Sequence, residues 1–435
     1  MKSSKVLAAL VTLGLAAAAA TPAMALENQF SGSYKAFYDL SNYSAVGGIP
    51  VKDAKTENYF VQRMRLGYTA KASEDVKLVT KFEFDYNWIG NSAYVNARGG
   101  GGALGADTVN METKNIYLDL NVAKGLNTKI GMQGYNDSFK GIIFDADMAG
   151  LLLSHEYANA SVTAGLFRFA DRTAANWSDI NTIGRYTQDM FSLDGKYNVS
   201  KDLKLGAAYY YFDDNRVAAK EAKVHTLGVN AEGAVGPVSL SGFALGQFGD
   251  YDAANSAKGY AFNLGAKMPL AGGTGRTEFL YASGGDKGKS LYIPESTVAG
   301  APFDTEGGGF YDNEMILLSR DKNATTVDYA IVYTVNNKDQ GVMFASAGYD
   351  YTFTPKLSGS ANLGLGWVAK DLANHKSKYL GTEFNVESNY QLMPSVTLGA
   401  RAGYVVLGDY FKNADINGNT PDNVYDVKLL AKFAF

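Results

Sequence analysis

The last eleven residues of the chain, 425–435, alternate between apolar and polar side chains and end on an aromatic residue. Successive side chains of a strand point to opposite faces, so this segment has one apolar face and one mostly charged face. The apolar face holds Tyr425, Val427, Leu429, Ala431, Phe433 and Phe435. The pattern is typical of a barrel strand that faces lipid on one side and a polar interior on the other. It predicts an all-β transmembrane barrel.

The final aromatic residues suggest how such a barrel would be assembled. Phe433 and Phe435 resemble the C-terminal signal that the outer-membrane assembly machinery of Gram-negative bacteria reads on barrel strands. The resemblance implies that machinery, together with outer-membrane lipid, as partners of the chain.

The opposite end of the chain has the features of an export signal. Lys2 and Lys5 precede an uncharged stretch, 6–20, and the small-x-small sequence Ala23-Met24-Ala25 follows. The stretch is short of the roughly 20 residues that a membrane-spanning helix needs, which disfavours a retained anchor. We expect residues 1–25 to be a signal peptide and residues 26–435 to form the barrel.

Composition excludes several classes of function. The 435 residues include 48 glycines, 29 tyrosines and 23 phenylalanines but no cysteine, so disulfides, thiol catalysis and thioether-bound haem are excluded. Without residues 1–25, which hold two lysines, 38 basic residues face 44 acidic ones and the formal net charge falls from −4 to −6. Such a balance gives no basic footprint for nucleic acid. Beyond the signal no run of about 18 apolar residues occurs, which disfavours helical membrane spans.

Turn sequences predict the strand count. Short turns are expected at 73–75, 124–125, 158–159, 200–202, 236–237, 269–275, 354–356 and 393–395. Eight hairpins and one further strand at each end give about 18 antiparallel strands, with 16 as the alternative, since bacterial single-chain barrels have an even number. The short turns are expected on the periplasmic side and the long loops outside the cell. Pro237, Pro269, Pro355 and Pro394 fall in the short turns, as expected of a residue that avoids strand interiors.

The same alternation assigns side chains to the lumen. A charge that faces hydrocarbon costs roughly 2 to 4 kcal/mol at the bilayer midplane, so charged strand residues are expected to point inward. The candidate pore-lining residues are Arg63, Arg65, Lys81, Glu83, Asp85, Asp119 and Arg401.

Two loops stand out. The third long loop, 136–150, combines apolar residues with Asp137, Lys140, Asp145 and Asp147. Two interpretations are open: the loop packs on the rim, or it folds inward as a constriction whose acids face Arg63, Arg65 and Lys81 and create a transverse field. The second loop, 284–339, is very long. Its residues 325–335 have strand character and predict either an extracellular hairpin or a plug.

Catalysis and cofactor binding have little support in the sequence. Of the three histidines, His155 directly follows Ser154, and adjacent strand residues point to opposite faces, so the two cannot form a nucleophile and base pair. The sequence around Asp415 has the glycine of a calcium loop at the wrong step and favours an exposed turn. We expect no enzyme activity, no cofactor and no metal site.

Residues 277–286 (TEFLYASGGD) and 380–411 resemble the closing hairpins of alginate-export-type barrels, a branch of the bacterial outer-membrane porins. The resemblance implies a barrel in the outer membrane and a channel through which small hydrophilic solutes or ions diffuse. Porins of this size also resemble the barrels that sheath multihaem cytochromes. The alternative function is therefore a sleeve around an electron-transfer partner, because the chain has no CxxCH motif of its own. The solute, the sign of ion selectivity and association into a homotrimer stay open.

Overall fold

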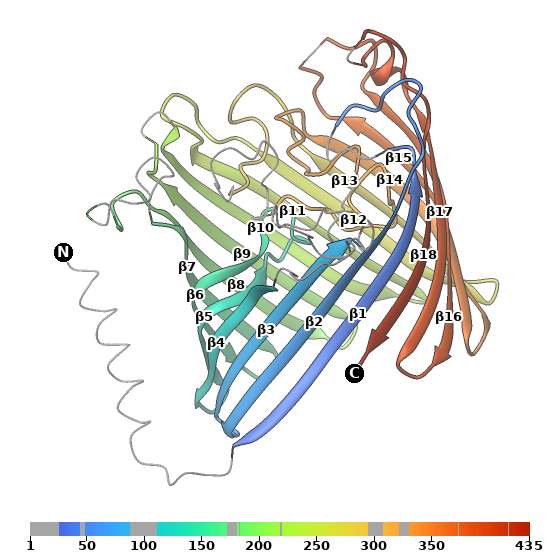
Figure 1. The fold of residues 1–435 in the computed structure, drawn as a ribbon. Helices are drawn as coiled ribbons and strands as arrows, with labels where there is room; N and C mark the ends of the chain where they lie inside the picture. The colour runs from blue at the N-terminus through green and yellow to red at the C-terminus, as the bar shows by residue number, and fades with distance from the viewer. Residues whose placement is uncertain are drawn as a thin grey trace.

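The chain folds into one closed antiparallel barrel of 18 strands (Figure 1). The computed structural model describes residues 26–43, 48–87, 111–171, 181, 183–217, 220–294, 308–321, 330–372, 374–415 and 417–435; for residues 59 and 85–87 it describes the backbone alone. Each strand pairs with its sequence neighbours, and β1 pairs with both β2 and β18. The predicted fold and the count of 18 strands are confirmed, and the alternative count of 16 is wrong.

The strands are 10 to 17 residues long. Their bounds are β1 Glu27–Ser41, β2 Glu57–Ser73, β3 Val76–Asn87, β4 Met111–Ala123, β5 Leu126–Asn136, β6 Asp145–Glu156, β7 Ala160–Ala170, β8 Gln188–Ser200, β9 Leu203–Asp214, β10 Ala222–Val235, β11 Val238–Asp250, β12 Tyr260–Leu270, β13 Gly273–Ala282, β14 Val342–Thr354, β15 Leu357–Val368, β16 Tyr379–Met393, β17 Val396–Leu407 and β18 Val424–Ala434. One short 3-10 helix, η4 (Asp409–Phe411), precedes β18. No helix among the described residues is long and apolar enough to cross a bilayer.

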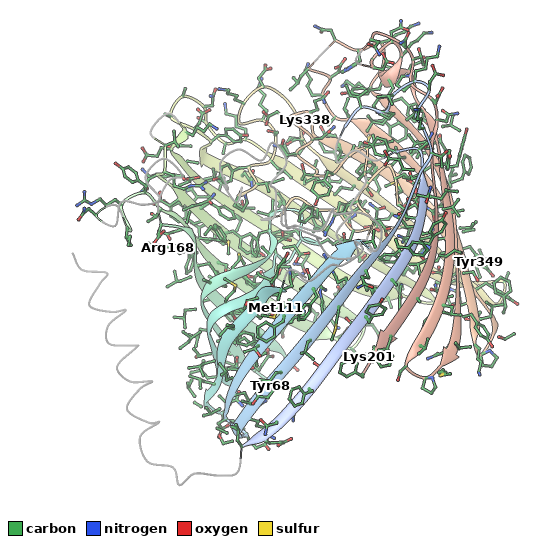
Figure 2. All side chains as sticks on the ribbon, viewed as in Figure 1. Tyr68, Met111, Arg168, Lys201, Lys338 and Tyr349 are labelled. Atoms are coloured by element: carbon green, nitrogen blue, oxygen red, sulfur yellow. The ribbon has the colours of Figure 1, made fainter. Side chains whose placement is uncertain are left out.

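All eight predicted short turns lie between consecutive strands and gather at one end of the barrel, while the long connections gather at the other (Figure 1). Figure 2 shows Tyr68 and Tyr349 toward the end with the short turns and Lys338 toward the end with the long connections. One proline differs from expectation: Pro269 lies within β12, where it pairs with Thr274 just before the strand ends. This place near a strand end is one where a missing backbone donor is tolerated.

The last strand shows the predicted alternation. Val427 and Leu429 are 39% and 55% exposed on the outer face, whereas Asp426 and Lys428 are 1% and 5% exposed on the inner face. The final residue continues the pairing, since the backbones of Phe435 and Gly32 exchange two hydrogen bonds. An apolar outside and a charged inside result from this alternation.

The inside of the barrel is packed by two of the long connections. Phe139, Ile142, Ile143 and Phe144 come from the connection between β5 and β6, and Met315, Leu317 and Leu318 come from the connection between β13 and β14. Both groups belong to one buried apolar cluster that also includes inward side chains of the strands. These connections therefore determine the shape of the remaining lumen.

Candidate functional site: the lumen

One side of the lumen carries basic residues from adjacent strands. Strand register places Lys432 of β18 opposite Lys35 of β1, and Lys35 opposite Arg63 of β2. Neighbouring strands lie about 4.8 Å apart, so three cations occupy one lateral row. Like charges in such positions repel one another, and this row therefore creates a positive potential in the lumen.

The row continues into a partly neutralised cluster on β2, β3 and β4. The buried carboxylate of Glu83 contacts Arg63 at 3.3 Å, Arg65 through a short hydrogen bond, and Lys114 at 3.5 Å. Lys114 also contacts Asp147 of β6 at 3.1 Å. We call Lys35, Arg63, Arg65, Lys81, Lys114 and Lys432 the basic wall. Glu83 and Asp147 contact these cations directly, and the strand register also places Asp85 opposite Arg63 and Glu112 opposite Glu83. The six cations therefore outnumber these four acids by two.

The first internal segment is the loop 137–144, which we call the inner loop. It leaves β5 and crosses toward the far wall, where Lys140 forms an ion pair with Glu278 of β13. Its apolar residues are fully buried, and Phe139 and Phe144 contact the rings of Tyr210 and Phe243 on β9 and β11. The loop therefore packs inside the barrel, and its role as a constriction stays a prediction.

The inner loop is organised by its own first residue. The Asp137 carboxylate accepts hydrogen bonds from the backbone N–H groups of Phe139, Gly141, Ile143 and Phe144, at 2.6 to 3.0 Å. Burial raises the pKa of the Asp137 carboxyl to about 6, and the four donated hydrogen bonds oppose this rise. Asp137 is therefore turned into the loop and does not face the basic wall.

A second hydrogen-bond network fixes the base of the inner loop to the wall. Asp194 of β8 accepts hydrogen bonds from the hydroxyl groups of Tyr135, Ser138 and Tyr210. The Tyr210 hydroxyl in turn accepts the backbone N–H of Ser138 at 2.8 Å. A buried network with its members this well paired rigidifies the structure around it.

The second internal segment is 308–321, which we call the wall segment because it lies along the inner faces of β14 to β18. The Glu383 carboxylate of β16 is fully buried and accepts the backbone N–H groups of Ile316, Leu317 and Leu318 at 2.7, 3.1 and 2.7 Å. Asn385, on the same inner face, donates to the carbonyl oxygen of Glu314 at 2.8 Å. Two side chains of one strand thus hold four residues of the wall segment, Glu314 and residues 316–318.

The end of the wall segment enters a buried ionic cluster. Asp321 forms a two-pronged ion pair with Arg401 of β17 and lies 3.8 Å from Lys428 of β18. Lys428 also contacts Asp39 at 3.2 Å and Asp426 at 3.1 Å. Arg401 was expected to line the pore, but the wall segment covers it and its side chain is 1% exposed. Its guanidinium group serves as an attachment point for the segment.

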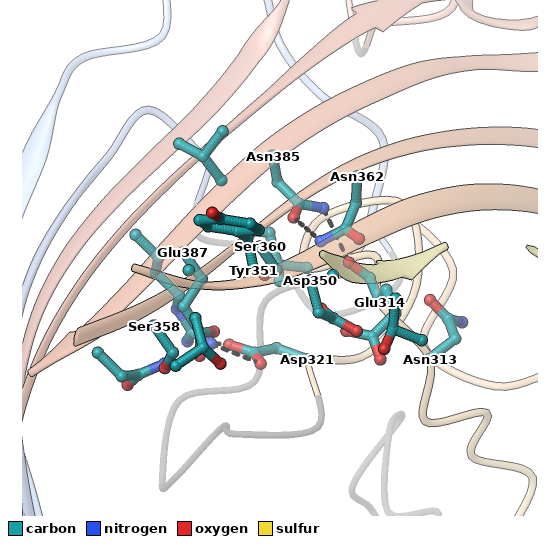
Figure 3. A pocket seen from close by; sticks show the side chains of 18 of the residues that line it. Asn313, Glu314, Asp321, Asp350, Tyr351, Ser358, Ser360, Asn362, Asn385 and Glu387 are labelled. Atoms are coloured by element: carbon teal, nitrogen blue, oxygen red, sulfur yellow. Dashed lines mark hydrogen bonds and ion pairs between the residues drawn. The ribbon is translucent and has the colours of Figure 1, made fainter. Parts of the chain in front are cut away.

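A cavity of about 440 Å³ opens beneath the wall segment, against β13 to β17 (Figure 3). Its lining is strongly polar and includes Asp350, Asn362, Asn385, Glu387 and Asn389 of the strands. Figure 3 shows Glu314 and Asp321 of the wall segment facing this cavity from the opposite side. This region of the lumen is therefore richer in acids and amides than the basic wall.

The two internal segments meet in the lumen. A Cβ atom placed on Gly308 would lie 2.4 Å from the carbonyl oxygen of Ile143 and 2.5 Å from Cα of Phe144, so the two backbones are in close contact. Asp145, directly after the inner loop, interacts electrostatically with Asp312 and Arg320 of the wall segment.

The predicted site residues fall into three groups. Arg63, Arg65, Lys81 and Glu83 come together at the basic wall, whereas Asp119 is separate and accepts a hydrogen bond from Asn127. Asp145 and Asp147 belong to β6, because the β5–β6 pairing extends to Asn136 and Asp145 and leaves a loop shorter than the expected 136–150. The side chain of Asp85 lies outside the described part of the chain.

The expected strand at 325–335 is not formed where the structure describes it. Residues 322–329 lie outside the described part, and residues 330–335 carry an isolated bridge between Val332 and Ser319. Ile331, Val332 and Val335 are buried in the same cluster as the wall segment. These described residues are therefore part of the interior packing.

Several inward residues were not among the predicted pore-lining residues. Lys428 and Lys432 were expected on the charged face of the last strand but were not assigned to the pore, and Lys35 and Glu383 also stand on polar faces of alternating strands. Lys114 could not be assigned because a register shift in the β3–β4 pairing, at Lys81 and Phe82, breaks the alternation next to it. Among the described residues, no group of three His, Asp or Glu side chains could hold a metal ion.

Comparisons with known proteins agree with the architecture. No protein-family model matches the sequence, and no curated protein matches it. Among solved structures, the outer membrane protein OpdK of Pseudomonas aeruginosa matches with a TM-score of 0.57 and 14% identity, over 94% of this chain and 98% of that one. OccK8 (OprE) of the same organism matches with a TM-score of 0.58 and 12% identity, over 94% of this chain and 98% of that one. OccAB4 of Acinetobacter baumannii matches with a TM-score of 0.57 and 12% identity, over 95% of this chain and 100% of that one.

Identities this low show the fold alone. The chain has the fold of outer-membrane β-barrels, and its resemblance to porin barrels of this membrane is confirmed at that level. The finer resemblance to the alginate-export-type branch is not shown by these matches.

Proposed function

We propose that the protein is an outer-membrane channel through which small hydrophilic solutes and ions diffuse, with a preference for anions. The observation that carries this proposal is the basic wall, where Lys432, Lys35 and Arg63 stand in one lateral row on the inside of the barrel. Charged rings in a narrow path are a general means of selecting ions by sign.

The acid-containing region beneath the wall segment supports a channel that selects solutes by charge over an unselective one. The basic wall occupies β18 to β4, and the polar cavity occupies β13 to β17, so the two charge regions lie on different parts of the inner surface. A solute in the lumen would experience a field between them. The transverse field predicted from the sequence is retained in this proposal, with Glu387 as its main acid, because Arg276 partly neutralises Asp350 at 2.9 Å and Glu314 at 3.6 Å.

The alternative function, a sleeve around a cytochrome, fits the interior less well. A sleeve needs room for a folded partner, whereas the inner loop and the wall segment cross the lumen and contact each other. The proposal also does not extend to polyuronates such as alginate. A polyanion needs a continuous cationic path, and the acids Glu314, Asp350 and Glu387 line this one.

Liposome swelling with two solutes of matched size tests the proposal. Vesicles that contain the purified mature protein are expected to admit a small monocarboxylate faster than its neutral amide. Lys35→Glu, which breaks the basic row, is expected to lower this ratio by a factor of roughly three to ten, because clefts of one sign concentrate solutes of the other. The matched control is Lys55→Glu, which introduces the same charge change at an exposed residue between β1 and β2.

Two results would contradict the proposal. Vesicles with correctly folded protein that admit neither solute would exclude a diffusion channel. Equal ratios for the wild type and Lys35→Glu would exclude the basic wall as the source of selectivity.

A further inference from the structure

Resting on the proposed channel function, we infer that Glu383 is a positioning residue that sets the width of the channel by holding the wall segment against the barrel. Its side chain is fully buried and cannot touch a passing solute. Any influence of Glu383 on permeation must therefore act through the residues that it binds.

The hydrogen bonds of Glu383 are concentrated on one short stretch of irregular backbone. The N–H groups of Ile316, Leu317 and Leu318 all donate to its two carboxylate oxygens. Ile331 and Val332 donate to the carbonyl oxygens of Leu317 and Leu318 and leave the three N–H groups to another acceptor. A buried unpaired donor is costly. A carboxylate supplied by the wall can accept all three at once because its two oxygens have about four acceptor positions.

The wall has a surface that receives the segment at this place. A Cβ atom on Gly364 of β15 would lie 2.5 Å from Cγ of Met315, and one on Gly403 of β17 would lie 2.7 Å from Cδ1 of Ile316. Larger residues at these two positions would push the segment into the lumen. Glu383 on β16 lies between these two strands, so the glycines flank the residue that binds the backbone.

The neighbouring polar contacts hold the segment to the same wall. Asn385 donates to Glu383 at 2.8 Å. It also donates to the carbonyl oxygen of Glu314 at 2.8 Å, and Asn362 donates to Asn385 at 2.7 Å (Figure 3). Asp321 is held by Arg401. Glu383 is the member of this set that binds the middle of the segment, at the point where the segment turns its apolar side chains to the wall.

Single-channel conductance of Glu383→Gln tests the inference. The amide has one acceptor oxygen in place of two and brings an NH2 group toward backbone donors, so the segment should leave the wall. The open-channel conductance is expected to change roughly twofold, since pore diameter governs passage. The matched control is Glu156→Gln, which removes the same charge at an exposed residue at the end of β6, beside a short turn, so its change in conductance should be clearly smaller.

An engineered disulfide between the wall segment and β15 tests whether the conductance of Glu383→Gln can be restored. The chain has no cysteine, so Met315→Cys with Gly364→Cys creates a single pair. The contact at Gly364 places the two Cβ atoms within about 4 Å, the range of natural disulfides. In the Glu383→Gln background, the oxidised pair is expected to restore the wild-type conductance, and reduction with dithiothreitol is expected to remove it again.

The outcomes separate the inference from the function on which it rests. A folded wild type that carries no current refutes the channel itself. A conducting wild type with the same conductance in folded Glu383→Gln refutes the role of Glu383 and leaves the channel intact. Failure of the cysteine pair to oxidise in an otherwise wild-type chain refutes the placement of the wall segment, even if Glu383→Gln does not fold.

Discussion

The inner loop and the wall segment solve the same physical problem in different ways. Both carry irregular backbone into the barrel, and both use a buried carboxylate to bind backbone N–H groups. In the inner loop the carboxylate belongs to Asp137, two to seven residues from its four donors. In the wall segment it belongs to Glu383, 65 to 67 residues from its three donors.

This difference separates local from global organisation. The inner loop can form its hydrogen bonds whenever its own eight residues adopt the right turn. The wall segment acquires its partners only after β16 and β17 have joined the barrel, because Glu383 and Arg401 stand on those strands. We therefore expect changes in the inner loop to affect stability most, and changes at the wall segment to affect the channel path most.

The largest effect on stability is expected from Asp137→Ala. The substitution leaves four buried donors without their acceptor, and each such donor costs about 1 to 3 kcal/mol. We expect the free energy of unfolding, measured by urea titration in lipid vesicles, to fall by at least about 3 kcal/mol. Asp145→Ala, directly after the same loop, is the control. Equal losses for the two variants would show that Asp137 does not organise the loop.

A somewhat smaller loss in the free energy of unfolding is expected from Arg401→Met. Asp321 then keeps Lys428, 3.8 Å away, as its partner, so the buried acid is only partly uncompensated. Removing one partner of a buried ion pair costs about 3 to 5 kcal/mol when the other charge is left alone, so with Lys428 still present we expect the same urea titration to show a loss of about 2 kcal/mol. The double variant Arg401→Met with Asp321→Leu should recover part of this loss, since neither charge stays buried. A double variant less stable than the single one would contradict the assignment of this pair.

The smallest effect on the free energy of unfolding is expected when an exposed ion pair of the same two-bond geometry is removed. Arg168 of β7 binds Asp189 of β8 through two hydrogen bonds of 2.7 and 2.9 Å, but the arginine side chain is 51% exposed. Because solvent screens such pairs, Arg168→Ala should lower the free energy of unfolding by less than about 1 kcal/mol. The same urea titration measures it. A loss as large as that of Arg401→Met would mean that burial is not what distinguishes the two pairs.

The sequence predicted the barrel well because its signals are local. Strand alternation and turn residues act over a few positions, and they identified all eight short turns and the inner face of β18. Alternation also placed Arg63, Arg65 and Glu83 on one side, and antiparallel register then brings them together.

The interior segments could not be predicted in the same way. Residues 308–321 have no periodic pattern, and their partners, Glu383 and Arg401, lie more than 60 residues away. Asp137 was expected to face the basic wall, but backbone donors within its own loop satisfy it instead. Arg401 was correctly expected to point inward, yet the residue that covers it belongs to a segment that no local rule could place.

The most direct test of this account is the current through single molecules of the purified mature protein in a planar bilayer under a salt gradient. The account predicts stable current steps with a reversal potential on the anion-selective side, because the basic wall keeps its net positive charge. Folded barrels that carry no current, or that conduct with a clear cation preference, would contradict it.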